Sequence, residues 1–403
     1  HDITGDICLE EMNNSMGSGY AGGSIAFNNM AAGIIENCEI KVTATFATNG
    51  AGTSSYGNFG GLVGVNEGNV SDCKLLSGSS IAIDANRVDT SFGGNIAGIV
   101  QMNRSGGTVK NCEVEEGVVL TGVGGGIVGT NNGSTSSIIN CINRADIDFL
   151  QESGGGIATS SQGPIENCIN YGNLSGSGNM AGIVRQQTGN GLSNCINYGD
   201  LSITSPEGTE TTYIAGGIVQ FLWITTAGDY QINGCQNFGD ISGDISTAGG
   251  VFGSYTKMSG CQLTMEECYN YGNISSTAAI ATLGGLIGTT ASDTVTTVNT
   301  WQNCYNLGNI TASGENTLAA GLYGGADSLM QFDSCYNLGE VSAATAYGAT
   351  APGLSLTNVY YLAGENLAAG DGTAMTAAQF ASGEAAWALD TENGATAHKN
   401  EWT

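Results

Sequence analysis

Short apolar runs alternate with turn residues over most of this chain. Between residues 125 and 148, pairs such as Ile127-Val128 and Ile138-Ile139 are separated by Gly, Asn, Ser and Thr. This part of the sequence lacks the 3.6-residue period of an amphipathic helix, whereas alternation bounded by turn residues is typical of short β-strands. The pattern therefore predicts an all-β protein built from many strands of a few residues each.

Two phrases recur along the chain. One is Gly-Gly followed by two aliphatic residues, as in 125–128. The other is Cys-x-Asn followed by an apolar residue and Gly, as in 168–172. Successive copies are separated by 27 residues (Cys168 to Cys195) to 40 residues (Cys195 to Cys235). The first position of the Cys phrase is held by Cys38, Cys73, Cys112, Cys141, Cys168, Cys195, Cys235, Cys268, Cys304 and Cys335.

One such unit cannot bury its own apolar face, but stacked units can. We therefore predict a single parallel β-solenoid (β-helix) of about ten to eleven coils over residues 1–362, with equivalent residues about 4.8 Å apart. His1 stands where a Cys would fall, so we expect the chain to begin partway through a coil of a longer protein. Two columns are expected to point inward: Ile127, Ile157, Ile183, Ile218, Val251 and Leu286 after Gly-Gly, and Leu174, Leu201, Ile241, Ile274, Ile310 and Val341 after Cys.

The stacking also predicts roles for the Cys phrase. Ten thiols at one repeat position are expected to form a column of small, reduced, buried side chains, because parallel Cβ vectors oppose disulfide geometry. Cys8 and Cys261 lie off this column, and we expect Cys261 to lie in a loop as a disulfide or reactive thiol. The position two residues after Cys is expected to form a corner with left-handed backbone angles and amide bonds between coils. It is held by Asn143, Asn170, Asn197, Asn237, Asn270, Asn306 and Asn337. The Gly four residues after Cys is expected to serve the same turn.

Residues 363–403 break the repeat and predict a C-terminal cap or linker. Thr376 and Gln379 have the spacing of a capping box, so a short helix is expected over 376–389. Phe380 and Trp387 are expected to share one face of that helix, with Leu389 outside it. We expect the helix to lie across the end of the solenoid, where it would protect unpaired strand edges.

The charge balance narrows the range of partners. The chain has 36 acidic and 9 basic residues, a net charge of −27. Such a surface repels phosphate backbones and anionic lipids, so we expect no nucleic-acid partner. No apolar run is long enough to span a bilayer, so no membrane insertion is expected.

The scarcity of histidine argues against catalysis. The only two histidines are His1 and His398, at the ends of the chain. Triads that depend on His and zinc sites are therefore not expected, and no cofactor is predicted. Paired carboxylates stay open as a route to polysaccharide hydrolysis. The candidates are Asp146 with Asp148, and Asp200 with Asp240 and Glu340, although Asn occupies the same repeat position as the second group. A structural calcium ion is a further alternative, but no calcium-loop motif is present.

Three successive coils are longer between Gly-Gly and Cys: 217–235, 250–268 and 285–304. We expect their insertions to lie side by side on one edge as loops. Grouped aromatic side chains suit stacking on sugars or anchoring of a protein. The ligand-binding candidates are Phe221, Trp223, Tyr230, Tyr255 and Trp301. The alternative is that these loops pack on one another and cover the solenoid.

The phrase Gly-Gly-Leu-Val-Gly at 60–64, repeated as Gly-Gly-Leu-Ile-Gly at 284–288, resembles the GLUG motif. Cys-Tyr-Asn-Leu-Gly-Asn-Ile at 304–310 is similar to repeats in surface proteins of Gram-positive gut anaerobes. The resemblance covers about residues 20–360. It implies an extracellular module of a large bacterial cell-surface or secreted protein, joined to further domains of the same polypeptide. Some relatives are immunoglobulin A peptidases, but their activity lies in other domains, and no His-Glu-x-x-His stretch occurs here.

The functional expectation is therefore a non-catalytic repeat module. It would act as a rigid stalk and an adhesion or ligand-presenting scaffold, with a host glycan or a host or bacterial surface protein as partner. The alternatives are a polysaccharide-degrading β-helix enzyme and a non-catalytic accessory region of a secreted peptidase.

Overall fold

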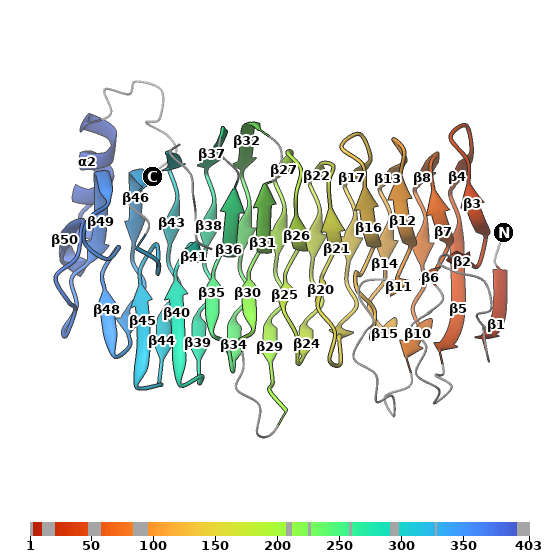
Figure 1. Ribbon diagram of the computed structural model, residues 1–403, viewed down its shortest axis with the longest axis horizontal. Coiled ribbons are helices and arrows are strands. Elements are labelled where there is room, and N and C mark those ends of the chain that lie inside the picture. The colour runs from red at the N-terminus through yellow and green to blue at the C-terminus, as the bar shows by residue number, and fades with distance from the viewer. Residues whose placement is uncertain are drawn as a thin grey trace.

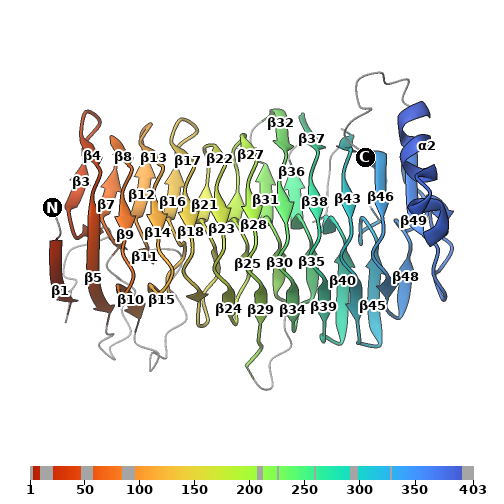
Figure 2. The same cartoon turned by 180° about the vertical axis from the view of Figure 1, so that it is seen from behind.

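The chain winds into a long stack of parallel strands that runs from the N-terminal to the C-terminal end (Figures 1 and 2). The computed structural model describes residues 3–9, 21–46, 58–83, 96–206, 212–224, 227–257, 260–290, 298–326 and 329–392. Every pairing between two named strands is parallel, and each coil pairs with the coils before and after it. The protein is an all-β parallel solenoid with two short helices near its C-terminal end.

A 31-stranded sheet forms one wall and carries the Cys phrase. Each coil contributes up to three short stretches to it. The stretch before Cys comprises β4 (Ile34–Glu36), β8 (Asn69–Ser71), β13 (Thr108–Lys110), β17 (Ser137–Ile139), β22 (Ile165–Glu166), β27 (Leu192–Ser193), β32 (Gly228–Asn233), β37 (Cys261–Glu266), β42 (Asn299–Gln302), β46 (Met330–Asn337) and β49 (Ser355–Leu362). The stretch at Cys comprises β9 (Lys74–Leu75), β14 (Glu113–Val114), β18 (Ile142–Asn143), β23 (Ile169–Asn170), β28 (Ile196–Asn197), β33 (Gln236–Asn237), β38 (Tyr269–Asn270) and β43 (Tyr305–Asn306).

The strands after Cys give the number of coils, because each coil contributes one of them. Eleven strands stack in this position: β1 (Ile3–Leu9), β5 (Glu39–Phe46), β10 (Ser80–Ile83), β15 (Val119–Thr121), β19 (Ile147–Asp148), β24 (Leu174–Gly176), β29 (Leu201–Ile203), β34 (Ile241–Gly243), β39 (Ile274–Ser276), β44 (Ile310–Ala312) and β47 (Val341–Ser342). This confirms a solenoid of the expected size. The last strand of the sheet is β50 (Thr373–Met375), which pairs with β49.

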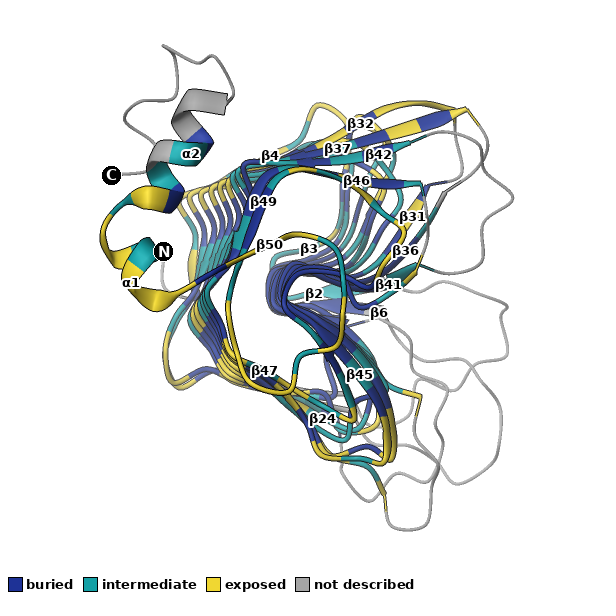
Figure 3. Cartoon of the chain, turned by 90° about the vertical axis from the view of Figure 1, so that its left-hand side faces the viewer, coloured by how far each residue is buried: buried dark blue, intermediate teal, exposed yellow. Residues whose placement is uncertain are grey.

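Two further walls meet at the Gly-Gly phrase. A nine-stranded sheet follows it: β3 (Ala26–Asn29), β7 (Val63–Asn66), β12 (Val100–Arg104), β16 (Val128–Asn132), β21 (Ala158–Ser161), β26 (Val184–Gln187), β31 (Val219–Ile224), β36 (Phe252–Lys257) and β41 (Ile287–Thr290). The wall before it comprises β2 (Ala21–Gly23), β6 (Asn58–Gly60) and β11 (Ile96–Ala97), then β20 (Gly154–Gly155), β25 (Met180–Ala181), β30 (Ile214–Gly216), β35 (Thr247–Gly249), β40 (Ile280–Gly284), β45 (Asn316–Ala320) and β48 (Thr345–Tyr347). Viewed along the axis, these two walls bend inward (Figure 3).

The inward bend explains the second glycine of the phrase. A Cβ atom on Gly156 would lie 2.5 Å from Asn170 Cγ, and one on Gly126 would lie 2.8 Å from Asn143 Cγ. The bend therefore touches the opposite wall, and only a residue without a side chain leaves room for the Asn column. The aliphatic residues expected to point inward are buried throughout both columns, except for the partly buried Val341.

The Cys and Asn columns form as predicted. The ten cysteines of the repeat form no disulfide, and all are buried except the partly exposed Cys38. Cys168 Sγ lies 3.4 Å from the carbonyl oxygen of Glu166 and 3.7 Å from that of Ile138, so its single S–H has two backbone acceptors within reach. Burial raises the pKa of Cys141, Cys195 and Cys304, which keeps these thiols protonated at neutral pH.

The seven Asn side chains are fully buried and joined in one chain of amide hydrogen bonds. Asn170 Nδ2 donates to Asn197 Oδ1 at 2.8 Å, and Asn197 Nδ2 donates to Asn237 Oδ1 at 2.8 Å. Each amide also donates to a carbonyl oxygen two residues on, as Asn197 does to Gly199. The ladder therefore satisfies polar groups that the inward bend has removed from water.

The corner itself lies elsewhere than expected. The left-handed residue is the one before Cys, such as Asn140, Asn167 and Asn194, each with φ near 53–54°. Asn two residues after Cys lies in a β-strand instead. The Gly four residues after Cys is not left-handed either. At Gly172 a Cβ atom would overlap the carbonyl oxygen of Ala145 in the preceding coil, so close stacking requires glycine there.

The C-terminal helices differ from the predicted cap in two ways. The helix is broken into α1 (Ala377–Ala381) and α2 (Glu384–Glu392) at Gly383, whose φ is +80°. The break shifts the phase, so Leu389 is buried although continuous periodicity placed it off the apolar face. The capping box of Thr376 and Gln379 is present. The pair packs on the outside of the wall that contains β49, and does not cover the open end (Figure 3).

Some of the sequence predictions concern residues or side chains that the structure does not describe. These are His1, the side chains of Cys8 and Trp387, and residues 393–403. Within the helices that the structure describes, none is long and apolar enough to cross a membrane.

Candidate functional site

The three long coils do not carry their aromatic residues on loops. In the first two of these coils the strands β31, β32, β36 and β37 are each six residues long and put Leu222, Tyr255 and Leu263 in the core. In the third coil, residues 291–297 lie outside the described part of the chain. Trp301 is fully buried between Phe252 and Phe332, with ring centroids 5.8 and 5.9 Å away. Tyr255 is 1% exposed and Tyr230 is 8% exposed. These three candidates therefore belong to the core, because the facing strands put their side chains inside.

Two of the five candidates reach the surface. Trp223 is 45% exposed on β31, and Phe221 is partly exposed beside it with ring centroids 6.4 Å apart. They form one small aromatic pair and not the five-membered cluster that the sequence suggests. Cys261 is fully buried in β37, so the loop position predicted for it is wrong.

Four of the five candidate carboxylates, those of Asp146, Asp148, Asp200 and Asp240, accept a hydrogen bond from a backbone amide. Asp146 Oδ1 accepts a hydrogen bond from the backbone N–H of Asn173 at 2.7 Å, and Asp148 Oδ1 accepts one from Leu150 at 2.9 Å. Five residues after Cys, the same pattern continues from coil to coil. Asp200 accepts from Asp240 N–H at 2.8 Å, and Glu340 N–H donates to Asn309 at 2.9 Å. Asn serves this position as well as Asp because only a side-chain oxygen is needed.

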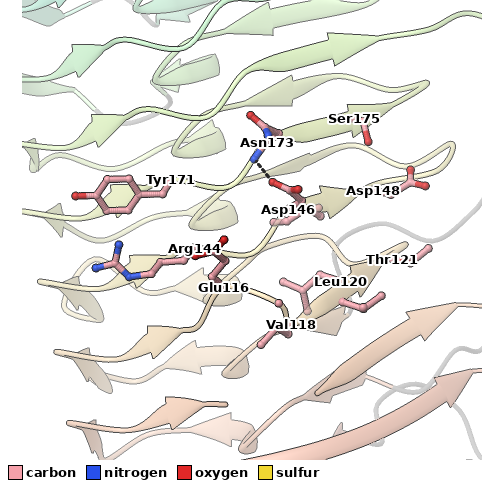
Figure 4. Close-up of a pocket in the computed structure, with 13 residues that line it drawn as sticks. Glu116, Val118, Leu120, Thr121, Arg144, Asp146, Asp148, Tyr171, Asn173 and Ser175 are labelled. Atoms are coloured by element: carbon pink, nitrogen blue, oxygen red, sulfur yellow. Dashed lines mark hydrogen bonds between the residues drawn. The ribbon is translucent and has the colours of Figure 1, made fainter. Parts of the chain in front are cut away.

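Asp146 and Asp148 nevertheless line a lateral groove with a volume of about 680 Å³ (Figure 4). Three neighbouring coils contribute to it: Val118 to Thr121, Arg144 to Asp148, and Tyr171 to Ser175. The open rim carries Glu116, Asp148, Asn173 and Ser175, all exposed. The groove therefore presents carboxylate, amide and hydroxyl groups at neighbouring heights along the stack.

One cation closes the side of the groove. Arg144 Nε lies 2.7 Å from Glu113 Oε1, and its guanidinium carbon lies 4.7 Å from the centre of the Tyr171 ring. The hydrogen bond to Glu113 raises the pKa of Arg144. Burial alone would raise the pKa of Glu113, but its contacts with Lys74 and Arg144 outweigh burial and lower it. Arg144 is thereby fixed over the ring at the groove wall.

Tyr171 also begins a surface row that the sequence analysis did not single out. Three residues after Cys, Tyr171, Tyr198, Phe238 and Tyr271 stack in order, with ring centroids 5.0, 4.9 and 4.4 Å apart. One residue after Cys, Tyr269, Tyr305 and Tyr336 stack at 4.0 and 4.9 Å. The Cys-x-Asn phrase itself could have predicted these two rows. Its Cys and Asn point inward, so the residues one and three positions after Cys point outward.

A second buried Asn ladder was also missed. On the nine-stranded sheet, Asn29, Asn66, Asn103 and Asn131 bond in sequence at 2.8 Å, and Asn131 continues to Ser161 at 2.9 Å. On this sheet the strand after the Gly-Gly phrase begins at Val63, Val100 and Val128. An Asn follows three residues later in each case, at Asn66, Asn103 and Asn131.

No cluster of three or more metal-ligating side chains occurs among the described residues. No protein-family model matches the chain, and no curated protein matches it, so the resemblance to GLUG repeats stays a prediction.

Proposed function

We propose that this chain is a non-catalytic, extracellular repeat module that serves as a rigid scaffold and presents the lateral groove to a glycan. The groove is the observation that carries the proposal. It combines Asp148, Asn173, Ser175 and Thr121, whose polar groups suit the hydroxyls of a sugar, on one side of a continuous strand stack.

Two properties support a scaffold in place of an enzyme. Asp146 and Asp148 each accept a hydrogen bond from a backbone amide, which gives both carboxylates a structural role. The Asn ladder and the Cys column join successive coils through buried contacts, which favours a stiff rod. Stiffness is what a stalk or a ligand-presenting module requires.

The test is a glycan array followed by titration of each hit. Replacing Ser175 by Trp would fill the groove from an exposed position, and we expect glycan binding to fall at least tenfold. The matched control is Ser275→Trp. Ser275 is also exposed and lies in the same column, three coils along the stack through Ser202 and Ser242. Equal binding by both variants would remove the groove from the proposal.

The enzyme alternative has its own readout. A panel of polysaccharides is incubated with the protein and assayed for new reducing ends. The scaffold proposal expects none. Turnover that disappears in Asp148→Asn, with the fold retained, would replace the scaffold by a hydrolase.

A further inference from the structure

The stacked aromatic rows form a surface larger than the groove. We define the aromatic face as Tyr171, Tyr198, Phe238, Tyr271, Tyr269 and Tyr305. Aliphatic residues extend the same two columns at Ile169, Ile196, Leu307 and Leu338. Tyr171 is 40% exposed and Tyr198 is 41% exposed, and the other members are partly exposed. The column three residues after Cys is apolar without a break, whereas Gln236 interrupts the other column between Ile196 and Tyr269. An apolar surface of this extent marks an interaction site.

The rings are stacked face to face, so they offer mainly their edges to a partner. The interplanar angle is 6° between Tyr171 and Tyr198 and 5° between Phe238 and Tyr271. Sugar stacking uses an exposed ring face, and here each inner ring has both faces covered by its neighbours. The geometry instead offers a ridged apolar strip, which suits the packing of apolar side chains from a protein.

The chain itself covers one end of this strip with helices. Tyr336 and Tyr360 continue the column of Tyr269 and Tyr305, and they pack against α1 and α2. Phe380 lies 6.2 Å from the Tyr336 ring, between centroids. Tyr360, Ala385 and Leu389 are all buried in this contact. The intramolecular contact shows which secondary structure fits the strip: a helix with a mixed aromatic and aliphatic stripe.

Acidic side chains flank the strip on both sides. Asp200, Asp240 and Glu340 lie five residues after Cys, and Glu166, Glu266 and Asp333 lie two residues before it. Within the described part of the chain, none of these six carboxylates has a Lys or Arg nitrogen within 4.0 Å. A partner with cations on either side of its apolar stripe would meet this charge.

We propose that the aromatic face docks a cationic amphipathic helix of a partner protein. The strip spans five coil steps from Tyr171 to Leu338 at about 4.8 Å each, or about 24 Å. A helix of about 16 residues has that length. Its Leu, Phe or Ala stripe would pack on the ring edges as α1 and α2 do, and its Lys or Arg residues would lie over the acidic rows. The strip meets the glycan groove at Tyr171, which both surfaces share, and its other residues lie outside the groove lining.

The probe is a fluorescent 18-residue peptide of Leu and Lys with all Leu on one helical face. A second peptide has the same composition in an order that forms no apolar face. We expect micromolar binding of the first peptide and at least tenfold weaker binding of the second. Equal binding of both would mean attraction by charge alone and would overturn the proposal.

Two variants locate the site. Tyr198→Ser is expected to weaken peptide binding at least tenfold, whereas Trp223→Ser, at an exposed aromatic off the strip, is expected to leave it unchanged. The double variant Asp200→Asn with Asp240→Asn removes charge but keeps the oxygen that caps the next coil, as Asn173 and Asn273 do. It is expected to weaken binding severalfold and to reduce its salt dependence. Unchanged binding in both the Tyr198 and the Asp variants would overturn the proposal.

Sedimentation at several concentrations tests a different occupant. A dimer that disappears in Tyr198→Ser would assign the strip to a second copy of the chain and would overturn the helix proposal. Ser175→Trp, which blocks the groove, is expected to leave peptide binding intact, so failure of the glycan proposal and failure of this one are distinguishable.

Discussion

The N-terminal and C-terminal coils use one backbone plan with their polar and apolar columns exchanged. Up to Asn131, the buried Asn ladder lies on the nine-stranded sheet, and the position two residues after Cys on the 31-stranded sheet holds Leu75 and Val114. From Asn143 onward the ladder lies on the 31-stranded sheet. The nine-stranded sheet then passes through Ser161 and Gln187 to the apolar residues Leu222 and Tyr255.

The outer face of the 31-stranded sheet changes at the same place. In the N-terminal coils it carries ion pairs, with Lys74 Nζ 2.8 Å from Glu113 Oε2 and Arg144 on the other oxygen. In the C-terminal coils the same columns hold stacked rings beginning at Tyr171. The Cys column continues through both regions without a change.

This exchange shows that the type of side chain is set along each column of the stack, and not separately in each coil. An Asn amide bonds to the Asn above and below, and a ring stacks on the ring above and below. A lone Asn in an apolar column would leave buried polar groups without partners. Like residues therefore occur in runs, and a run ends where another column takes over its role.

Removal of Trp301 is expected to give the largest effect. Trp301 occupies the same column as Val109, and both are fully buried. Trp301→Ala should lower the free energy of unfolding by about 3–5 kcal/mol, because it leaves a large cavity. Val109→Ala should cost about 1–2 kcal/mol. Urea unfolding followed by circular dichroism measures both, and a Trp301 variant of wild-type stability would contradict the enclosed position of this ring.

Interruption of the C-terminal Asn ladder should come next. Asn197→Ala leaves a donor on Asn170 and an acceptor on Asn237 without their partner. We expect a loss of about 2–4 kcal/mol in unfolding free energy. The comparison variant is Val114→Asn, which places an amide in the same column next to Asn143. It should change stability by less than about 1 kcal/mol, because its amide gains a partner in Asn143. Similar losses in the two variants would refute the exchange of columns.

The smallest effect belongs to the ion pairs of the N-terminal coils. Glu113→Gln should lower the unfolding free energy at pH 7 by about 0.5–1 kcal/mol, since the partners are partly solvated. The pKa of Glu113 is lower in the folded protein than in the unfolded chain. Its stabilising contribution is therefore full above the ordinary Glu pKa of about 4.3 and disappears as the pH falls below it. Wild type and variant should converge at acid pH, and a constant difference from pH 7 to pH 3 would contradict this account.

Much of the architecture was readable from repetition. The recurring Cys phrase predicted the parallel stack, the reduced Cys column and the ladder through Asn170 and Asn197. It did not distinguish which Asn makes the corner. Asn occurs both before Cys, as Asn167, and after it, as Asn170, and either tolerates a left-handed backbone. The strand pairing decided the matter, because it places Asn170 in the ladder of β23.

The candidate site was less readable. Trp223 and Trp301 both belong to coils with insertions, yet one is 45% exposed and the other fully buried. Their exposure follows from the alternation of side chains along each strand: Trp223 points outward between the buried Leu222 and Ile224, whereas Trp301 occupies an inward position of β42. The groove beside Arg144 and Asp148 was unreadable for another reason, since it needs residues from three coils that are distant in sequence.

The sequence by itself determined the periodicity, the phase of the Cys phrase and the type of residue in each column, because neighbours one repeat apart stack directly. Only the tertiary structure decided the inward bend at Gly126 and Gly156, which brings two walls into contact. It also decided the burial of Trp301 and the packing of α1 and α2 beside Tyr336, and not across the open end. These features depend on how the walls of one coil face each other, and stacking periodicity contains no information about that distance.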